Sequence, residues 1–397
     1  MKICKLIRRH SFLDVRVFQK EARSLAALGH EVVVMAPRFD GRLLDVNRSP
    51  LRNTEFKPEA FMHHGVHVVT YRARIAPPNP KAMLQDIYGG TLHYRLDALM
   101  DKAIGIGADV YHAHEPETLY EAVQAKRALR KQGKDVKVVF DAHELEADTS
   151  LLRALMQETD RLITVSDSIA SIYASRYPQV PVTLIYNSPR LGADPSKEAA
   201  PPPFSAERPF TIGYEGQITR EKGNPYRMLD ILNKMTDAGL HVRFKILGKI
   251  MITVNSERMN LERQFKADPR IEYGWASYDS LGEQWNDVDA GFIYFKLNTP
   301  NRKYALPNKL FSLMNSGVPI VVNDAPAMGA VINKAECGIV IPNPLPSADA
   351  YAEQFAKLYH DRELLAAMGR RARAVMQEEY GWERMEERLK TLYEGLS

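Results

Sequence analysis

The stretch YALPNKLFSLMNSGVPIVVND, residues 304–324, contains the unit from which this chain is built, a helix followed by a buried strand. Pro307 and Asn308 are residue types that begin helices, and Gly317 is the residue type that most often ends them. The run PIVVND that follows is short, β-branched and apolar, which is typical of a strand in a sheet core. A helix that leads directly into such a strand indicates an α/β fold.

Strand candidates of the same kind recur along the chain in two sets, and helical segments separate them. The first set is KICKLI, EVVVMAP, HVVTYR, DVYHAH, KVVFDAH, LITVSD and VTLIYN; the second is FTIGYEG, VRFKILG, IEYGW, AGFIYF, PIVVND and CGIVIP. This alternation is typical of doubly wound parallel sheets. Residues 188–209, between the sets, are rich in Pro, Ala and Ser and lack periodicity, so we interpret them as a linker.

The sequence therefore predicts two Rossmann-like domains that face a central cleft. The first covers residues 1–187, the second covers residues 210–381, and the helix 382–397 packs back on the first domain. Ligands of such sheets bind at the carboxyl ends of the strands, so polar residues at those ends are the candidates for the site.

Composition excludes several classes of protein. At 397 residues the chain is too long for one compact core, and its 45% hydrophobic and 26% charged residues are ordinary for a folded protein. A net charge of +4 fits anionic ligands but is too small for a dedicated nucleic-acid binder. Two distant cysteines predict neither a disulfide framework nor a zinc site.

The expected location is the cytoplasm, because the sequence has no signal-peptide pattern and no apolar run of membrane-spanning length. The basic segments KLIRRH, KRALRKQGK and RARIAPPNPK are compatible with peripheral binding to an anionic membrane at its inner face. They are equally compatible with ordinary solvated surface.

A first candidate site is the segment IGYEGQITREKG, residues 212–223, where a strand ends at Gly216 and a helix begins after Lys222 and Gly223. Glycines permit close approach of a ligand, and a helix start attracts anions. Lys222 is therefore a candidate phosphate ligand, although a Lys-Gly pair in such a loop is also common in solvated turns. The chain has no GxGxxG fingerprint and no P-loop, which argues against NAD-type and ATPase functions.

A second candidate is the opening stretch, where Asn308 and Ser312 share one face of the predicted helix. The alternative is that Asn308 only caps the helix and Ser312 is a small residue at a helix contact. Lys309 gives this helix start a positive charge, as Lys222 does for the other. A diphosphate would satisfy both lysines.

Five motifs resemble, in order along the chain, the landmarks of the GT-B retaining glycosyltransferases of family 4, also called glycosyltransferase group 1. They are DVYHAHEP, FDAHE, LITVSDSIA with VTLIYNSP, GYEGQITREKG and LPNKLFSLMNSGVPIVVND. The resemblance implies retaining, metal-independent transfer of a hexose-type sugar from a nucleotide diphosphate sugar, without a further cofactor. It implies a glycan, lipid-linked or small-molecule acceptor, in the synthesis of bacterial surface polysaccharide.

The resemblance also implies which residues hold the donor, with Lys222 stabilising the leaving diphosphate. The implied donor residues are Gly216, Gln217, Lys222, Gly223, Arg302, Asn308, Lys309 and Ser312. Three positions depart from the usual pattern: Gln217 replaces an arginine, and Tyr304 and Ser312 replace a pair of carboxylates. A serine accepts a weaker hydrogen bond from a ribose than a carboxylate does. As a hypothesis, Arg220, Arg302 and Lys303 supply the missing positive charge.

The first domain is expected to hold the acceptor. The resemblance places a catalytic histidine at His114, at the end of a strand, where a purely structural histidine is the alternative. His143 and Glu144, near Asp141 at the next strand end, either line the acceptor site or cap the following helix. Arg8, Asp14 and Arg16 could contact a polar or anionic acceptor, but Asp14 could also only cap the helix predicted from Val15 to Leu28.

Two other classes of function remain open because a fold does not fix an activity. One is an epimerase or hydrolase that acts on a nucleotide sugar. The other is a non-catalytic sugar-binding subunit, which the altered positions Gln217, Tyr304 and Ser312 favour.

Overall fold

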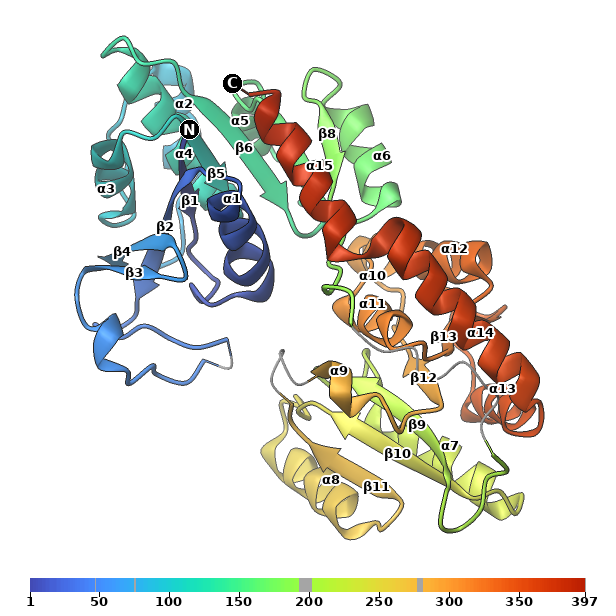
Figure 1. Cartoon of the computed structure of the whole chain (residues 1–397). Helices are drawn as coiled ribbons and strands as arrows, with labels where there is room; N and C mark the ends of the chain where they lie inside the picture. The colour runs from blue at the N-terminus through green and yellow to red at the C-terminus, as the bar shows by residue number, and fades with distance from the viewer. Residues whose placement is uncertain (47, 75, 193–201, 277–280, 397) are drawn as a thin grey trace. The chain divides into compact units, whose positions relative to one another are not determined.

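The computed structural model describes residues 1–46, 48–74, 76–192, 202–276 and 281–396 (Figure 1). The chain forms two compact units. Unit 1 comprises Met1–Ile185 with Glu386–Ser397, and unit 2 comprises Tyr186–Met385. Of the predicted linker 188–209, residues 193–201 lie outside the described residues, and the remainder belongs to unit 2.

Unit 1 is built on an eight-stranded sheet, as far as the described residues go, in the order β3-β4-β2-β1-β5-β6-β7-β8. All neighbours pair in parallel except β3 and β4. The strands are β1 Lys2–Leu6, β2 Glu31–Arg38, β3 Ala60–His63, β4 Val66–Arg72, β5 Val110–Ala113, β6 Lys137–Ala142, β7 Arg161–Thr164 and β8 Val182–Leu184. The seven strands predicted for the first set are confirmed. Strand β3 was not predicted; it is only four residues long, and these residues are half-buried or exposed.

The helices of unit 1 connect these strands. They are η1 Val15–Ala22, α1 Arg23–Ala27, η2 Thr54–Phe56, α2 Pro80–Gly89, α3 Leu99–Ile106, α4 Pro116–Arg130, α5 Ser150–Met156 and α6 Asp167–Arg176. The helix predicted from Val15 to Leu28 is present, but its first eight residues, η1, form a π-helix. Such π-helical turns are rare and occur most often at functional sites.

The last helix, α15 Trp382–Glu394, begins in unit 2 and ends in unit 1 (Figure 1). Within unit 1 it makes specific contacts with the sheet and with α1. The Tyr393 hydroxyl lies 2.7 Å from Nδ1 of His112, and Arg388 donates to the carbonyl of Leu184 at 3.0 Å. Ser24 donates a short hydrogen bond to Glu386. The C-terminal segment is therefore part of the core of unit 1.

Unit 2 is built on a parallel six-stranded sheet, again within the described residues, in the order β11-β10-β9-β12-β13-β14. All six predicted strands of the second set are confirmed. The strands are β9 Phe210–Glu215, β10 Val242–Leu247, β11 Ile271–Gly274, β12 Ala290–Ile293, β13 Ile320–Asn323 and β14 Gly338–Ile341. The helices are α7 Pro225–Asp237, α8 Asn255–Ala267, α9 Leu281–Gln284, α10 Pro300–Tyr304, α11 Asn308–Asn315, α12 Pro326–Ala335, α13 Ala348–His360, α14 Arg362–Val375 and η3 Met376–Tyr380.

The two units are thus both Rossmann-like α/β units with mainly parallel sheets, as the sequence predicts. In unit 2, α7 and α11 follow the ends of β9 and β12, so both helices begin at the carboxyl edge of the sheet. Among the described residues, no helix combines the length and the apolar character that crossing a lipid bilayer requires.

Candidate functional site

The loop between β9 and α7 has a backbone that only particular residues can adopt. Gly216 has φ +99° and Gly223 has φ +70°, both in the region that favours glycine. A Cβ atom on Gly223 would lie 2.6 Å from the ring of Tyr214, so the glycine also permits close packing. Asn224 caps α7 by accepting a hydrogen bond from the Arg227 N–H at 3.3 Å. The glycines predicted from the sequence therefore shape this loop.

The same loop is hydrogen-bonded to the segment that follows β12. Gly223 donates to the carbonyl of Tyr294 at 2.9 Å, and Lys296 donates to the carbonyl of Glu221 at 2.8 Å. Lys222 and Phe295 face each other in a short antiparallel bridge between these two bonds. The backbone around Lys222 is therefore fixed to the neighbouring strand end.

Lys309, in the first turn of α11, reaches the same place. Its Nζ atom lies 3.9 Å from the centre of the Tyr214 ring and 5.7 Å from the centre of the Phe295 ring. The Nζ atom of Lys222 lies 5.6 Å from the Phe295 ring. A Cβ atom on Gly216 would be 3.6 Å from the Lys309 ammonium. The structure thus brings together Gly216, Lys222 and Lys309, which the sequence placed on separate helix starts.

Lys309 is only 8% exposed, and this burial lowers the pKa of its ammonium group. Loss of contact with water lowers the pKa of the Lys309 side chain from its ordinary value to about 7. The negative charge of Glu215 raises this pKa in part, and the positive charge of Lys222 lowers it further. The ammonium of Lys309 is therefore poorly solvated in the free protein. A negatively charged ligand at this position would relieve that penalty.

Asn323, at the end of β13, holds the backbone of Phe295 in place by hydrogen bonds. Its side-chain amide donates to the carbonyl of Phe295 at 2.9 Å and accepts from the Phe295 N–H at 3.1 Å. It also donates to the carbonyl of Pro344 at 3.0 Å. The sequence analysis missed both Asn323 and Phe295, although a polar residue that ends the buried run PIVVND was a usable signal.

Two other predicted donor residues have different surroundings. Asn308 is exposed and does not cap α11, because the cap position is occupied by Pro307 without a side-chain hydrogen bond. The alternative role for Asn308 is therefore wrong. The hydroxyl of Ser312 accepts a hydrogen bond from the indole N–H of Trp285 at 3.0 Å. Ser312 consequently holds a buried aromatic residue, which is close to the contact role considered from the sequence.

Arg220 and Arg302, which were expected to supply the missing positive charge at the donor site, already have partners within the protein. Arg220 forms an ion pair with Glu257 at 2.7 Å, and Arg302 donates to the side chain of Asn298 at 2.5 Å. Gln217 is exposed, and its backbone carbonyl accepts from the Tyr214 hydroxyl at 2.7 Å. Both arginines would have to leave these partners to bind a phosphate.

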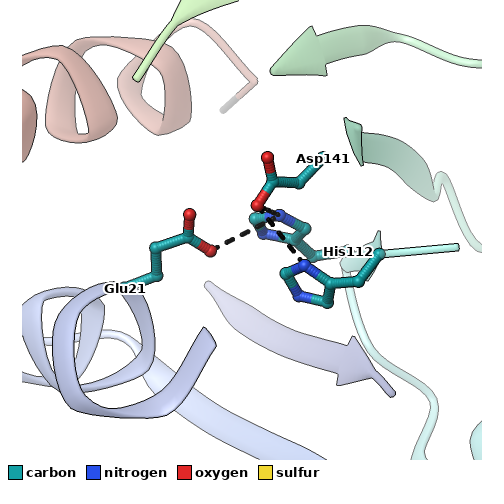
Figure 2. A group of neighbouring side chains, drawn as sticks. Glu21, His112 and Asp141 are labelled. Atoms are coloured by element: carbon teal, nitrogen blue, oxygen red, sulfur yellow. Dashed lines mark ion pairs between the residues drawn. The ribbon is translucent and has the colours of Figure 1, made fainter. Parts of the chain in front are cut away.

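Unit 1 contains a buried cluster of ionisable side chains where β1, β5, β6 and η1 meet. Figure 2 shows Glu21, His112 and Asp141 directed toward one another, with His112 Nε2 3.8 Å from Glu21 and 4.0 Å from Asp141. Lys5 pairs with Glu21 at 2.7 Å. Arg16 binds both oxygens of Asp141, at 2.8 and 2.7 Å, and its Nε lies 3.2 Å from Glu21. Two cations and two carboxylates balance in this cluster.

The charge balance bears on whether the cluster could hold a metal ion. Candidate ligand atoms of Glu21, His112, His114 and Asp141 lie within 4.8 Å of one another. Both carboxylates are, however, already neutralised by Lys5 and Arg16. A divalent ion would add two uncompensated positive charges to a buried, neutral group, which is costly. The residues therefore fit an internal ion-pair network better than a metal site.

His114 does not reach a ligand surface, contrary to the prediction. Its side chain is 0% exposed and its ring stacks on that of His112, with centres 4.6 Å apart. Thr118 accepts the His114 N–H at 3.1 Å and holds the turn into α4. The ring therefore points into the cluster, where Nδ1 lies 3.4 Å from Asp141 and 3.1 Å from Nε2 of His143.

His143 and His10 form the exposed end of this network. Their side chains are 19% and 31% exposed, and their rings lie 5.1 Å apart. Nδ1 of His10 lies 3.4 Å from the carboxylate of Asp14. Burial alone would lower the pKa of His10, but the negative charges of Asp14 and Glu115 outweigh burial, so this pKa is raised. The sequence analysis missed His10, although it directly follows the first strand and the two arginines of KLIRRH.

The remaining acceptor-side predictions divide into structural roles and surface positions. Arg16 is buried in the cluster and is not available to an acceptor, so that prediction is wrong. Asp14 caps η1 by accepting from the N–H groups of Arg16 and Val17, which confirms the alternative. Glu144 is exposed, and the cap of α5 is Thr149, so Glu144 does not cap that helix.

Arg8 is likewise held by the protein itself. Its guanidinium pairs with Asp97 and Glu121, and the residue is 8% exposed. The Arg8 guanidinium is therefore already paired with two carboxylates. Arg8 nevertheless lines a cavity of unit 1, so its contact with a polar or anionic acceptor stays a prediction.

The buried histidines predict how the stability of unit 1 depends on pH. Burial, and then the charge of Lys5, hold the pKa values of His112 and His114 well below the ordinary value. Below about pH 6.5 the unfolded chain binds protons at both residues and the folded chain does not. The free energy of unfolding should therefore fall with falling pH, by at most about 2.7 kcal/mol per pH unit. Urea unfolding at pH 7, 6 and 5 measures this slope.

A pair of variants assigns the slope to these residues. His114→Asn should reduce it by about one proton, whereas His64→Asn, at an exposed position, should leave it unchanged. Equal slopes in all three proteins would contradict the assignment.

Comparisons with known proteins agree with this architecture. The family model Glycosyltransferase Family 4 matches residues 15–188, and the model Glycosyl transferases group 1 matches residues 305–375. A search of curated proteins found no match.

Solved structures resemble the whole chain at low sequence identity. The HepE protein of Anabaena in complex with UDP has a TM-score of 0.70 and 13% identity, with 100% of both chains covered. Sucrose-phosphate synthase of Thermosynechococcus elongatus has a TM-score of 0.68 and 15% identity, with 100% of this chain and 99% of that chain covered. At these identities the likeness shows the fold, which is GT-B. The two family models, which match different parts of the chain, together with this fold support a family 4-like, group 1 glycosyltransferase.

Proposed function

We propose that the chain transfers a sugar from a nucleotide diphosphate sugar to a glycan, lipid-linked or small-molecule acceptor, with retention at the anomeric carbon. The observation that carries the proposal is the convergence of Lys222 and Lys309 on the ring of Phe295 at the carboxyl edge of the unit 2 sheet. Ligands of open α/β sheets bind at this edge. HepE, a structural relative, has been crystallised with UDP-glucose, which supports UDP as a first probe.

The two lysines are suited to the chemistry of the leaving group. When the bond between the anomeric carbon and the β-phosphate oxygen breaks, negative charge grows on the diphosphate. Ammonium groups held in a poorly solvated place stabilise that charge more in the transition state than in the bound donor. The acceptor hydroxyl attacks the anomeric carbon, and its proton passes to an oxygen of the departing diphosphate. In this scheme the lysines provide the charge stabilisation, and no metal ion is required.

On the acceptor side we propose His143 and His10 as the groups that meet the acceptor, in place of His114. Both are partly exposed, and His143 is tied to the buried Asp141 at 3.0 Å. His114 then acts as a positioning residue, because its Nδ1 lies 3.1 Å from His143. The synthesis of a bacterial surface polysaccharide is the pathway that the family suggests.

The lowered pKa of Lys309 predicts that the protein takes up a proton when the donor diphosphate binds. At pH 8 a lysine with a pKa of about 7 is mostly neutral, and a bound diphosphate favours its charged form. Binding of UDP at pH 8 should therefore take up about one proton, and less at pH 6, where Lys309 is already charged. Calorimetric titrations in buffers of different ionisation enthalpy measure the uptake.

Two variants test the origin of that proton. Lys309→Met should bind UDP without the uptake, whereas Lys234→Met, at the far end of α7, should behave as the parent protein does. Binding enthalpies that do not depend on the buffer at pH 8 would rule out the site around Lys309.

The activity is tested by incubating the protein with UDP-, GDP-, ADP- and TDP-sugars, with and without candidate acceptors, in the presence of EDTA. We expect sugar transfer that requires an acceptor and persists in EDTA. Free monosaccharide or an epimer without an acceptor would identify a hydrolase or epimerase. Donor binding without any product would identify a non-catalytic binding subunit. This is the second candidate function, because the Ser312 hydroxyl is already hydrogen-bonded to Trp285 at a position where the family has a donor-binding carboxylate.

A further inference from the structure

A cavity of about 390 Å³ lies in unit 1. It is lined by residues of the segments that follow four neighbouring strands of the sheet, β4, β2, β1 and β5. Its lining residues are Arg8, Arg9, Phe39, Arg48, Arg74, Ala76, Pro77, Pro78, Leu96 and Glu117. Because all four strand ends belong to the carboxyl edge of a parallel sheet, the cavity occupies a place where such folds bind ligands.

The chain order also reverses at this point of the sheet. Strand β1 lies between β2, its successor in the chain, and β5, which returns on the other side. A reversal of this kind leaves a crevice between the loops of the two central strands. The loop after β1 contributes Arg8 and Arg9 to the lining of the cavity.

The four arginines of the cavity differ in how their charges are compensated. Arg8 is neutralised by Asp97 and Glu121, and Arg9 pairs with Glu117. Among the described residues, no carboxylate pairs with Arg48 or Arg74. The four arginines and the three carboxylates together carry a net charge of about +1, and the positive charges without a carboxylate partner are those of Arg48 and Arg74.

The two arginines without a carboxylate are held in place by the backbone around them. The guanidinium of Arg48 donates to the carbonyl of Arg9 at 2.9 Å, and the Arg48 backbone has φ +69° in a turn closed by a hydrogen bond to Asp45. The N–H of Arg74 donates to Asp97 at 3.2 Å, the carboxylate that also binds Arg8. The Arg48 guanidinium is thus bound to the loop after β1, and the backbone of Arg74 is bound to the carboxylate that pairs with Arg8.

The rest of the wall is apolar. Phe39, Pro77, Pro78 and Leu96 offer no hydrogen-bonding side chain to a ligand. A sugar bound here would leave its hydroxyl groups facing carbon, which is costly. An alkyl chain would instead gain from burial against the same surface.

We propose that this cavity binds a phosphate group that carries an apolar substituent, with Arg48 and Arg74 holding the phosphate. Guanidinium groups bind phosphate oxygens in pairs, and two of them match a doubly charged phosphate better than a singly charged carboxylate. If the chain transfers a sugar as proposed, the ligand of this cavity is the acceptor, and the acceptor is an alkyl or prenyl phosphate derivative. This step of the inference rests on the proposed function. His10 is next in the chain to Arg9, which lines the cavity, and its ring lies 5.1 Å from that of His143.

Calorimetric titration of the full chain with hexyl phosphate, inorganic phosphate and glucose 6-phosphate tests the inference. We expect hexyl phosphate to bind at least tenfold more tightly than either of the other two. The double variant Arg48→Gln/Arg74→Gln should weaken this binding at least tenfold. The matched double variant Arg42→Gln/Arg52→Gln, which removes the same charge from a separate hollow of unit 1, should leave it unchanged.

The same titrations in a Lys222→Ala background separate the two sites. Hexyl phosphate should still bind in that background, because Lys222 lies in unit 2. Absent binding of hexyl phosphate, tighter binding of glucose 6-phosphate, or equal affinities in the two double variants would each overturn the inference. Binding of UDP, measured on the same samples, reports on the donor site independently, so a failure of the proposed function is recognised separately.

Discussion

Replacing Lys222 by alanine is expected to lower turnover with the nucleotide sugar by 10²- to 10³-fold, which corresponds to the loss of about 3–4 kcal/mol of transition-state stabilisation. The backbone of the loop should survive the change, because it is held by hydrogen bonds of Gly223 and Glu221 to the segment after β12. The loss should appear mainly in kcat, since the charge that Lys222 meets grows as the diphosphate leaves. Steady-state kinetics with the donor identified in the panel measures it.

The matched control is Lys234→Ala, a lysine in the last turn of α7, the helix that follows the loop of Lys222. Lys234 pairs with Asp349 at 2.5 Å on the surface of unit 2, so its loss should change turnover by less than threefold. Turnover of Lys222→Ala within threefold of the parent would falsify the assignment of the diphosphate to this loop. Equal losses in both variants would point to a general effect of charge and not to a site.

Replacing Arg16 by leucine is expected to lower the free energy of unfolding of unit 1 by about 3–5 kcal/mol. The side chain binds both oxygens of Asp141, lies 3.2 Å from Glu21 and donates to the carbonyl of Ile185 at 2.9 Å. Removing it leaves two buried carboxylates with Lys5 as the remaining cation of the cluster described above. Burial alone would raise the pKa of Asp141, and it is Arg16 with the neighbouring histidines that keeps this pKa well below the ordinary value.

Urea unfolding, followed by a probe in unit 1, gives the difference directly. The control is Arg153→Leu, which breaks an exposed pair with Asp148 and should change the free energy of unfolding far less than Arg16→Leu does. A loss of similar size in both variants would show that the cluster does not depend on the guanidinium. In that case the stability of unit 1 would have to come from the apolar core alone.

Much of the fold could be predicted because the chemistry that fixes it is local. Short β-branched runs alternate with helical segments, and each run became a strand whose ends lie within three residues of the predicted bounds. The pairing of β3 with β4 escaped prediction because its alternation is weak and its position is set by the turn at His64 and Gly65. The π-helical form of η1 escaped too, since no pattern in the residues separates it from an α-helix.

The candidate site of unit 2 was predictable for a similar reason. In a parallel sheet the loops after neighbouring strands meet at one edge, so Lys222 and Lys309 could be placed together from their positions after strands alone. Their common partner Phe295, and Asn323 behind it, could not be placed in this way. Their roles depend on which side chains of β12 and β13 face the loop.

The sequence by itself thus determined the two α/β units, the order of their strands along the chain and the two helix starts that carry lysines. Only the tertiary structure decided that Ser312 meets Trp285, that His114 is enclosed beside Asp141, and that Arg48 and Arg74 share a cavity with residues far apart in the chain. Periodicity and helix signals are properties of neighbouring residues, so a sequence displays them. Burial, charge compensation and hydrogen-bond partners arise between distant residues, and packing alone selects them.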